Sequence, residues 1–262
     1  MNTTAYLRRI GLTPASVDHK DPNALRRLQR AHVTTVPFEN LSIVGPPHST
    51  EDGDGIDLSP AALYEKIVEH GRGGYCFELN GLFHDLLTAL GYEVDRLAAR
   101  VTSAFQTPAN HHPLLVHLDE PVLVDVGTGP PMLRRPLPLD GTPRTDEAGV
   151  AWRVGESDRS DADYRAEVRS PDAEEWTGRY VFTSTPRPQS YFAAANDYLQ
   201  SAPESPFTGD PLVARSTDNG YRKLSGTTLT YVSGANTTEH PVPPDDVPGV
   251  LSRLFGLAPD SR

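Results

Sequence analysis

The sequence has few of the residues that typify extracellular, membrane-spanning or nucleic-acid-binding proteins. Of its 262 residues only one is cysteine, so no disulfide can form within the chain and a reducing compartment is its natural setting. Lysine occurs three times, and 35 acidic residues outweigh 24 basic ones to give a net charge of −11, which argues against nucleic acid as a partner. No stretch approaches the roughly eighteen apolar residues of a membrane span, and the first residues lack a signal-peptide core. We therefore expect a soluble, cytoplasmic protein that binds neither nucleic acid nor membrane.

Apolar residues at helical spacing occupy much of the first third of the chain. Leu7 and Ile10 suit a short N-terminal helix, and Asp21-Pro22 is typical of the start of a second one. Ser59-Pro60 repeats this start signal, and Gly71 is placed to end the helix that follows.

A single stretch, residues 72–80 (RGGYCFELN), holds the only cysteine between two glycines and a helical pattern. The pattern continues to Gly91, so we expect Cys76 at or near a helix N-terminus. Unpaired amides and the helix dipole stabilise a thiolate there, which is the nucleophilic form of cysteine. A lone cysteine can also be a small buried hydrophobe. The stretch alone does not decide between these two interpretations.

After Gly91 the hydrophobic period changes to that of strands. Such periodicity predicts strands over residues 92–102, 114–118, 122–126, 151–154, 164–168, 175–183, 212–216 and 221–232. Strands at this spacing suggest a barrel or sandwich-like middle. Two proline-rich stretches, 130–143 and 203–211, are predicted to be loops, and a last helix should run from Pro244 to Gly256.

Histidine and aspartate side chains near the strand ends could complete a nucleophilic site with Cys76. A cysteine nucleophile needs a base and a third group that orients the base. His111 and His112 precede strand 114–118, and Asp125 ends the neighbouring strand, where a buried carboxylate requires strong hydrogen bonds. A three-residue turn at 118–120 places His111 on the face of Asp125, whereas a two-residue turn at 119–120 favours His112.

The remaining histidines show no comparable pattern. His84 lies eight residues after Cys76 on the same predicted helix, about 12 Å along its axis, which is too far for direct contact. Residues 52–55 (DGDG) have turn chemistry but lack the ligand pattern of a calcium loop. No histidine pairs with Asp or Cys at metal-ligand spacing, so we predict no metal site.

These residues lie in stretches that resemble the arylamine N-acetyltransferase family along nearly the whole chain. The matching stretches are Pro37-Phe38-Glu39-Asn40-Leu41, residues 72–81, the His-x-x-Leu-Leu-Val strand that starts at His111, Asp125-Val126-Gly127, Asn196-Asp197-Tyr198 and Ser205-Pro206-Phe207.

The resemblance implies an α+β protein with a cysteine-protease-like arrangement of three domains. These are an N-terminal helical bundle that carries the nucleophile (1–90), a central β-barrel that carries His and Asp (91–200), and a C-terminal α/β lid (201–262). It implies that acetyl-CoA acetylates Cys76, that His111 is the base, favoured over His112 by the strand match, and that Asp125 orients it. The acetyl group would pass, in a ping-pong reaction without a metal, to the nitrogen of an arylamine, arylhydrazine or similar amine. An ion pair between Arg72 and Glu39 would brace the loop before the cysteine.

One departure from the family pattern keeps alternative functions open. Position 128 is Thr where the family usually has Phe, so an aromatic wall of the acceptor pocket is missing. The alternative within the family is an amide synthase acting on a polyketide or other long acyl thioester. A hydrolase and a non-catalytic binding protein are the more distant alternatives. The residues that contact CoA and the oligomeric state are left unassigned.

Overall fold

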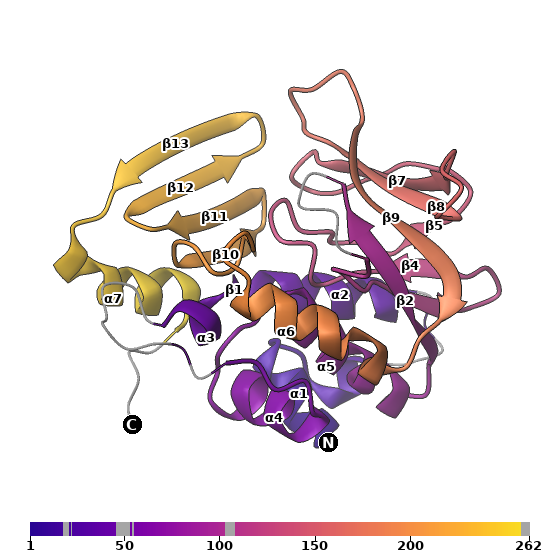
Figure 1. Ribbon diagram of the computed structural model, residues 1–262, viewed down its shortest axis with the longest axis horizontal. Helices are drawn as coiled ribbons and strands as arrows, with labels where there is room; N and C mark the ends of the chain where they lie inside the picture. Colours follow the sequence, from indigo (N-terminus) through magenta and orange to yellow (C-terminus); the bar gives the residue numbers. More distant parts are fainter. Residues whose placement is uncertain (18–20, 22, 46–52, 54, 103–107, 258–262) are drawn as a thin grey trace.

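A computed structural model describes residues 1–17, 21, 23–45, 53, 55–102 and 108–257, arranged as a helical region, an eight-stranded sheet and a five-stranded sheet (Figure 1). The helices are α1 (Thr3–Arg9), α2 (Ala24–Thr35), α3 (Leu41–Val44), α4 (Pro60–Tyr64), α5 (Cys76–Ala89), α6 (Ala193–Ser201) and α7 (Val247–Val250). Single π turns over Glu65–Glu69 and Leu251–Phe255 extend α4 and α7. Three short 3-10 helices cover Pro14–Ser16, Gln189–Phe192 and Pro244–Asp246. Pro22, and Asp52 and Asp54 of the acidic loop, lie outside the described residues.

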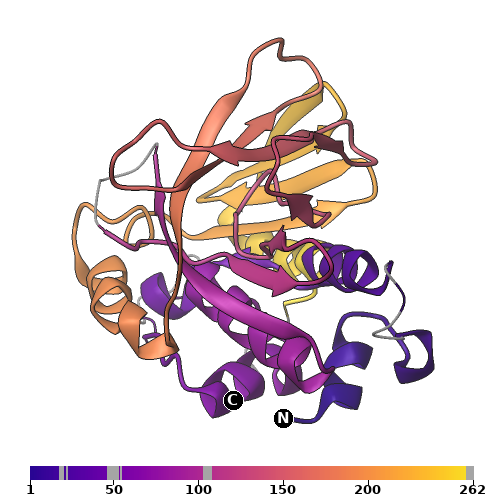
Figure 2. The same ribbon diagram turned by 90° about the vertical axis from the view of Figure 1, so that its right-hand side faces the viewer.

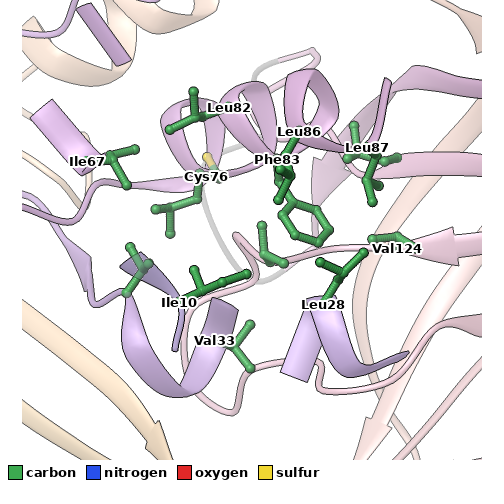
Figure 3. Packing of buried hydrophobic residues seen from close by; sticks show 14 of the residues in the cluster. Ile10, Leu28, Val33, Ile67, Cys76, Leu82, Phe83, Leu86, Leu87 and Val124 are labelled. Carbon is green, nitrogen blue, oxygen red and sulfur yellow. The ribbon is translucent and has the colours of Figure 1, made fainter. Parts of the chain in front are cut away.

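The helical region confirms the signals at Ser59-Pro60 and Gly71, whereas α2 begins at Ala24, with Asn23 and not Asp21 at its N-cap. Ser59 caps α4 by accepting a hydrogen bond from the amide of Ala62 (3.4 Å), and Pro60 is the first helical residue. Gly71 adopts φ +67°, a conformation that favours glycine and reverses the chain after the helix. Helix α5 packs its apolar face over α1 and α2, and Figure 3 shows Leu82, Phe83 and Leu86 above Ile10, Leu28 and Val33.

The eight-stranded sheet is antiparallel and curls around a core of its own (Figure 2). Its strands, in spatial order, are β5 (Leu137–Pro138), β4 (Val122–Val124), β3 (Leu114–His117), β2 (Glu93–Val101), β9 (Thr177–Pro186), β8 (Tyr164–Arg169), β7 (Ala151–Glu156) and β6 (Arg144–Thr145). Trp152, Tyr180 and Phe182 are fully buried in that core. The barrel-like middle that the strand spacing predicted is therefore present.

The hairpin of β3 and β4 settles which of two registers the chain adopts. Leu114 pairs with Val124 and Val116 with Val122, so residues 118–120 form a three-residue turn. Continuing this register sets Pro113 opposite Asp125 and puts His111 on the face of that carboxylate. The two-residue turn, which favoured His112, is wrong.

The five-stranded sheet combines residues from both halves of the chain. Its order is β1 (Phe38–Glu39), β10 (Leu212–Thr217), β11 (Gly220–Ser225), β12 (Thr228–Ser233) and β13 (Asn236–Pro241). Helix α7 and the turn after it pack on this sheet through a third apolar cluster that includes Val247, Leu251 and Phe255. The helix ends as predicted at Gly256, which is left-handed (φ +73°).

Several elements differ from those expected. The strand predicted over 221–232 is a hairpin of two strands that turns at Gly226, where φ is +54°. Strand β13 was missed because all six of its residues are exposed and no apolar alternation marks them. Helix α6 was missed because its sequence is largely small and polar. The short strands β5 and β6 lie within or directly after a stretch predicted to be loop.

None of the helices in the described part of the chain has the length and apolar character needed to cross a membrane. The domain boundaries at residues 90 and 200 remain a prediction. Strand β1 lies in the first of these regions by sequence but pairs with β10, which lies in the third.

Candidate active site

Cys76 is the first residue of α5, as the sequence predicted, and a carboxylate fixes the backbone just before it. Glu78 Oε2 accepts a hydrogen bond from the amide of Tyr75 (3.1 Å), and Glu78 Oε1 accepts a second one from Lys66 Nζ (2.6 Å). A side chain at position 73 would collide with the carbonyl oxygen of Pro37, because a Cβ there would lie 2.1 Å from that atom. The glycine is therefore required for this close packing.

The ion pair implied for the loop before the cysteine is also present. Arg72 Nη2 lies 3.1 Å from Glu39 Oε1, and Glu39 Oε2 accepts the amide of Leu41 at 2.7 Å. Burial acts to raise the pKa of Glu39, but Lys66 and Arg72 outweigh it and hold the pKa below its usual value. The carboxylate is thus ionised and ties the loop to β1.

His111 and Asp125 form a buried hydrogen-bonded pair. His111 Nε2 lies 2.6 Å from Asp125 Oδ2. The other oxygen, Oδ1, accepts Asn80 Nδ2 at 2.8 Å and the amide of Gly127 at 2.9 Å. Burial acts to raise the pKa of Asp125, but His111 and these donors lower it below the usual range. Asp125 is therefore a carboxylate that can orient an imidazole.

His112 points into a different environment from its neighbour. Its Nε2 lies 3.2 Å from the carbonyl oxygen of Phe77, and its ring packs 4.7 Å from that of Phe192. Burial lowers the pKa of His112 to about 3, so the ring is neutral at physiological pH. His84 is also separate from the His111–Asp125 pair, because its own carboxylate partner is Asp85, whose Oδ1 lies 3.0 Å from His84 Nδ1.

Cys76 and His111 line the same cavity, which has a volume of about 230 Å³ and lies between the helical region, β2, β9 and the chain before β10. The described lining residues are Phe38, Cys76, Val101, Asn110, His111, Gly127, Thr128, Gly129, Pro130, Arg179, Leu199, Pro206, Phe207 and Leu212. Cys76 Sγ lies 3.8 Å from the carbonyl oxygen of Asn110, next to His111. A Cβ on Gly127 would lie 2.8 Å from Cys76 Cα, so the turn after Asp125 packs directly on the helix start.

The helix end does not by itself make Cys76 a thiolate. Burial raises the pKa of the Cys76 thiol well above its usual value, and the nearby charge of Asp125 adds to the rise. The backbone amides of Phe77 and Cys76 act in the predicted direction and lower the pKa, but they do not outweigh burial. Ionisation of the thiol therefore depends on a neighbouring group that accepts its proton and becomes positive.

Thr128 directs its hydroxyl into its own loop. Thr128 Oγ1 donates to the carbonyl oxygen of Gly129 (3.0 Å) and accepts the amide of Leu133 (3.2 Å). Phe38 and Phe207, whose ring centroids lie 6.2 Å apart, are the phenylalanines among the described lining residues. The cavity thus has aromatic walls that do not depend on position 128.

Three residues of the site were not predicted from the sequence. Asn80 joins α5 to the β3–β4 hairpin, and its position four residues after Cys76 on a helix could have revealed it. Tyr180 packs its ring 4.9 Å from that of His111, and Arg179 lines the cavity. For these two residues no signal was available from spacing alone. Within the described ranges, no group of three or more His, Cys, Asp or Glu side chains is arranged to hold a metal ion.

The chain is similar to characterised proteins over nearly all its length. A model of the N-acetyltransferase family matches residues 21–261. The arylamine N-acetyltransferase of Mycolicibacterium smegmatis is 34% identical over 249 residues, covering 92% of this chain and 85% of that protein. The arylamine N-acetyltransferase of Mycobacterium tuberculosis is 36% identical over 271 aligned residues, covering 98% of this chain and 89% of that protein. The solved structure of Mycobacterium marinum arylamine N-acetyltransferase in complex with CoA has a TM-score of 0.84 and 31% identity, with 98% and 93% of the two chains covered.

Proposed function

The chain belongs to the arylamine N-acetyltransferase family, and from this premise we propose that it transfers an acetyl group from acetyl-CoA through Cys76 to the nitrogen of an arylamine, arylhydrazine or similar amine. The observation that carries the proposal is the His111–Asp125 pair, 2.6 Å apart, on a cavity that Cys76 also lines. The CoA complex of the Mycobacterium marinum relative supports acetyl-CoA as the acyl donor.

In the first half-reaction His111 takes the proton of the Cys76 thiol. The hydrogen bond from Nε2 to Asp125 selects the tautomer that leaves Nδ1 free to accept this proton. The imidazolium that results stabilises the thiolate, which offsets the effect of burial on the thiol. The thiolate attacks the carbonyl carbon of acetyl-CoA, the bond from that carbon to the CoA sulfur breaks, and His111 returns the proton to CoA.

In the second half-reaction the acceptor amine replaces CoA in the cavity. Its nitrogen attacks the acetyl carbon on Cys76 while His111 accepts the proton that the nitrogen loses. The carbon–sulfur bond then breaks, the amide leaves, and Cys76 regains its proton from His111. CoA therefore leaves before the amine reacts, which is a ping-pong order.

The C-terminal lid that the resemblance implied would consist of the five-stranded sheet and α7. Leu212, the first residue of β10, lines the cavity, and Pro206 and Phe207 precede it. These contacts support a role for residues 201–262 in closing the acceptor cavity, in a cysteine-protease-like arrangement of the three regions.

An amide synthase that acts on long acyl thioesters is the alternative expected from the sequence. The relatives named above are arylamine N-acetyltransferases and give that alternative no support. A chain length series of acyl-CoA donors separates the two, because a synthase for long chains would transfer them faster than acetyl.

Intact mass measurement tests the proposal directly. Protein mixed with acetyl-CoA and no amine should gain one acetyl group on Cys76 and release one CoA per chain, and added aniline or phenylhydrazine should remove that group as the amide. The Cys76→Ala variant should show neither step. An unmodified mass with every acyl-CoA tried would refute the proposed function.

A further inference from the structure

The loop over residues 125–133 carries one member of the proposed triad and one wall of the cavity. Its first residue is Asp125, and its middle, which includes Gly127 and Thr128, lines the cavity. Two hydrogen bonds within the loop shape it, because Asp125 Oδ1 accepts the amide of Gly127 at 2.9 Å and Thr128 Oγ1 accepts the amide of Leu133 at 3.2 Å. A displacement of this loop would therefore move the carboxylate and the cavity wall together.

Both ends of the loop bond to the side chain of Gln29, a completely buried residue of α2. Gln29 Nε2 donates to the carbonyl oxygen of Leu133 at 2.9 Å and to that of Asp125 at 3.4 Å. No backbone amide in the described part of the chain donates to either oxygen. Because Asp125 and Leu133 are buried as well, the two carbonyl groups depend on Gln29 for their hydrogen bonds.

Packing alone does not account for an amide side chain at position 29. Gln29 Oε1 is buried and has no hydrogen-bond partner among the described residues. A buried amide oxygen without a partner costs free energy, whereas a methionine would fill a similar volume without that cost. Helix α2 also packs on the β3–β4 hairpin through Leu28, which Figure 3 shows pointing toward Val124. The distinct contribution of Gln29 is therefore its pair of N–H donors.

We propose that Gln29 is a positioning residue for acetyl transfer, which holds the backbone of Asp125 so that its carboxylate faces His111. This inference rests on the proposed function and adds a residue that touches neither the substrates nor the reacting atoms. His111 Nε2 lies 2.6 Å from Asp125 Oδ2, so a small shift of the Asp125 backbone lengthens this bond. A longer bond stabilises the imidazolium of His111 less, and the thiol of Cys76 then ionises less readily.

The Gln29→Met variant tests the proposal, because methionine has a similar length and no N–H donor. The rate of alkylation of Cys76 by iodoacetamide at pH 7 should fall about fivefold or more, as expected for the loss of hydrogen bonds to two buried carbonyls, and its pH profile should move to higher pH. The NMR resonance of the proton between His111 and Asp125 should move to higher field as that bond lengthens. Gln29→His keeps one ring N–H at a similar reach and should restore part of the rate.

Val33→Ala is the matched control, since it removes apolar contacts from the same helix but no hydrogen-bond donor. It should lower the midpoint of urea unfolding and leave the alkylation profile and the NMR resonance unchanged. A wild-type profile in Gln29→Met, or an equal loss in Val33→Ala, would overturn the positioning role.

Two provisions keep the test decisive. If Gln29→Met does not fold, Gln29→Asn replaces it with the same expected losses, because its amide is one methylene too short to reach both carbonyl oxygens. Alkylation and NMR need no acetyl transfer, so they still decide the role of Gln29 if no acyl-CoA modifies Cys76 and the proposed function fails.

Discussion

His111 Nε2 lies 2.6 Å from Asp125 Oδ2, and both side chains are almost completely buried. A bond of this length between buried groups fixes the tautomer and the orientation of the imidazole. It also explains why Asp125 tolerates a site flanked by Val124 and Val126, since three donors satisfy its oxygens.

The first prediction concerns the charge of Asp125. Asp125→Asn keeps the size of the side chain, but its oxygen would stay with the donors Asn80 and Gly127 and its NH2 would face His111, which loses the acceptor for the required tautomer, so kcat should fall by about 10²- to 10⁴-fold. Steady-state acetylation of an aniline measures the change. Asp95→Asn, which changes the partner of the half-exposed His117, is the matched control. A loss of less than about tenfold would contradict the orienting role.

The second prediction concerns the ionisation of Cys76. Burial raises the pKa of this thiol, so its reactivity at pH 7 should depend on His111. In His111→Ala the rate of alkylation by iodoacetamide should fall about tenfold or more, because each unit of pKa changes the thiolate fraction tenfold. His84→Ala should alkylate like the wild type. An unchanged rate of alkylation in His111→Ala would mean that the amides at the start of α5 are sufficient to ionise the Cys76 thiol.

The third prediction concerns Asn80, whose side chain connects α5 to both strands of the β3–β4 hairpin region. Its Nδ2 donates to the carbonyl oxygen of His112 at 2.9 Å as well as to Asp125, and its Oδ1 accepts the amide of Val126 at 2.9 Å. Asn80→Ala leaves these buried groups without partners, so the free energy of unfolding should fall by about 2 to 3 kcal/mol. Urea unfolding measures the loss. Asn236→Ala on exposed β13 should lie within about 0.5 kcal/mol of the wild type.

The fourth prediction concerns the dependence of stability on pH. Burial lowers the pKa of both His112 and His32 to about 3, whereas the unfolded chain binds protons on these rings below about pH 6.5. The unfolded state therefore gains protons first, and the free energy of unfolding should decrease as the pH falls from 6.5 towards 3. The slope should be on the order of 1 kcal/mol per pH unit for each histidine.

Between pH 6.5 and pH 5 the change in stability comes mainly from the protonation of histidines, because most carboxylates bind protons only at lower pH. His112→Gln should flatten the decrease in this window, although it also lowers the overall stability by altering the bond to Phe77. His70→Gln replaces an exposed ring and should leave the slope unchanged. Equal slopes in wild type and His112→Gln would show that His112 is protonated without unfolding.

Local signals in the sequence predicted the helices other than α3 and α6, and the main catalytic candidates. Ser59-Pro60 and Gly71 act within a few residues of the helix that they start or end, so their effect can be inferred without the fold. The choice between His111 and His112 depended on the length of one turn, because a change of one residue in register exchanges the faces of a strand. Both lengths were compatible with the sequence.

Features that depend on pairing between distant segments could not be predicted in this way. Arg179 enters the cavity through a bulge against β8, and no property of β9 alone marks the bulged residue. Strand β13 carries no apolar alternation and forms only because β12 offers it a complete edge. The effect of burial on the thiol of Cys76 likewise depends on the surrounding fold, which a helix-end argument omits.

Strand β1 has a consequence for the order in which the protein can mature. Glu39 pairs with β10 on one side, and on the other its amide donates to the carbonyl oxygen of Gly74, two residues before Cys76. The pairing of the strand that contacts the loop before Cys76 is therefore complete only when β10 has been synthesised, long after the residues of α5. A nascent or truncated chain that ends before residue 212 would contain Cys76, His111 and Asp125 but lack the strand that pairs with Glu39.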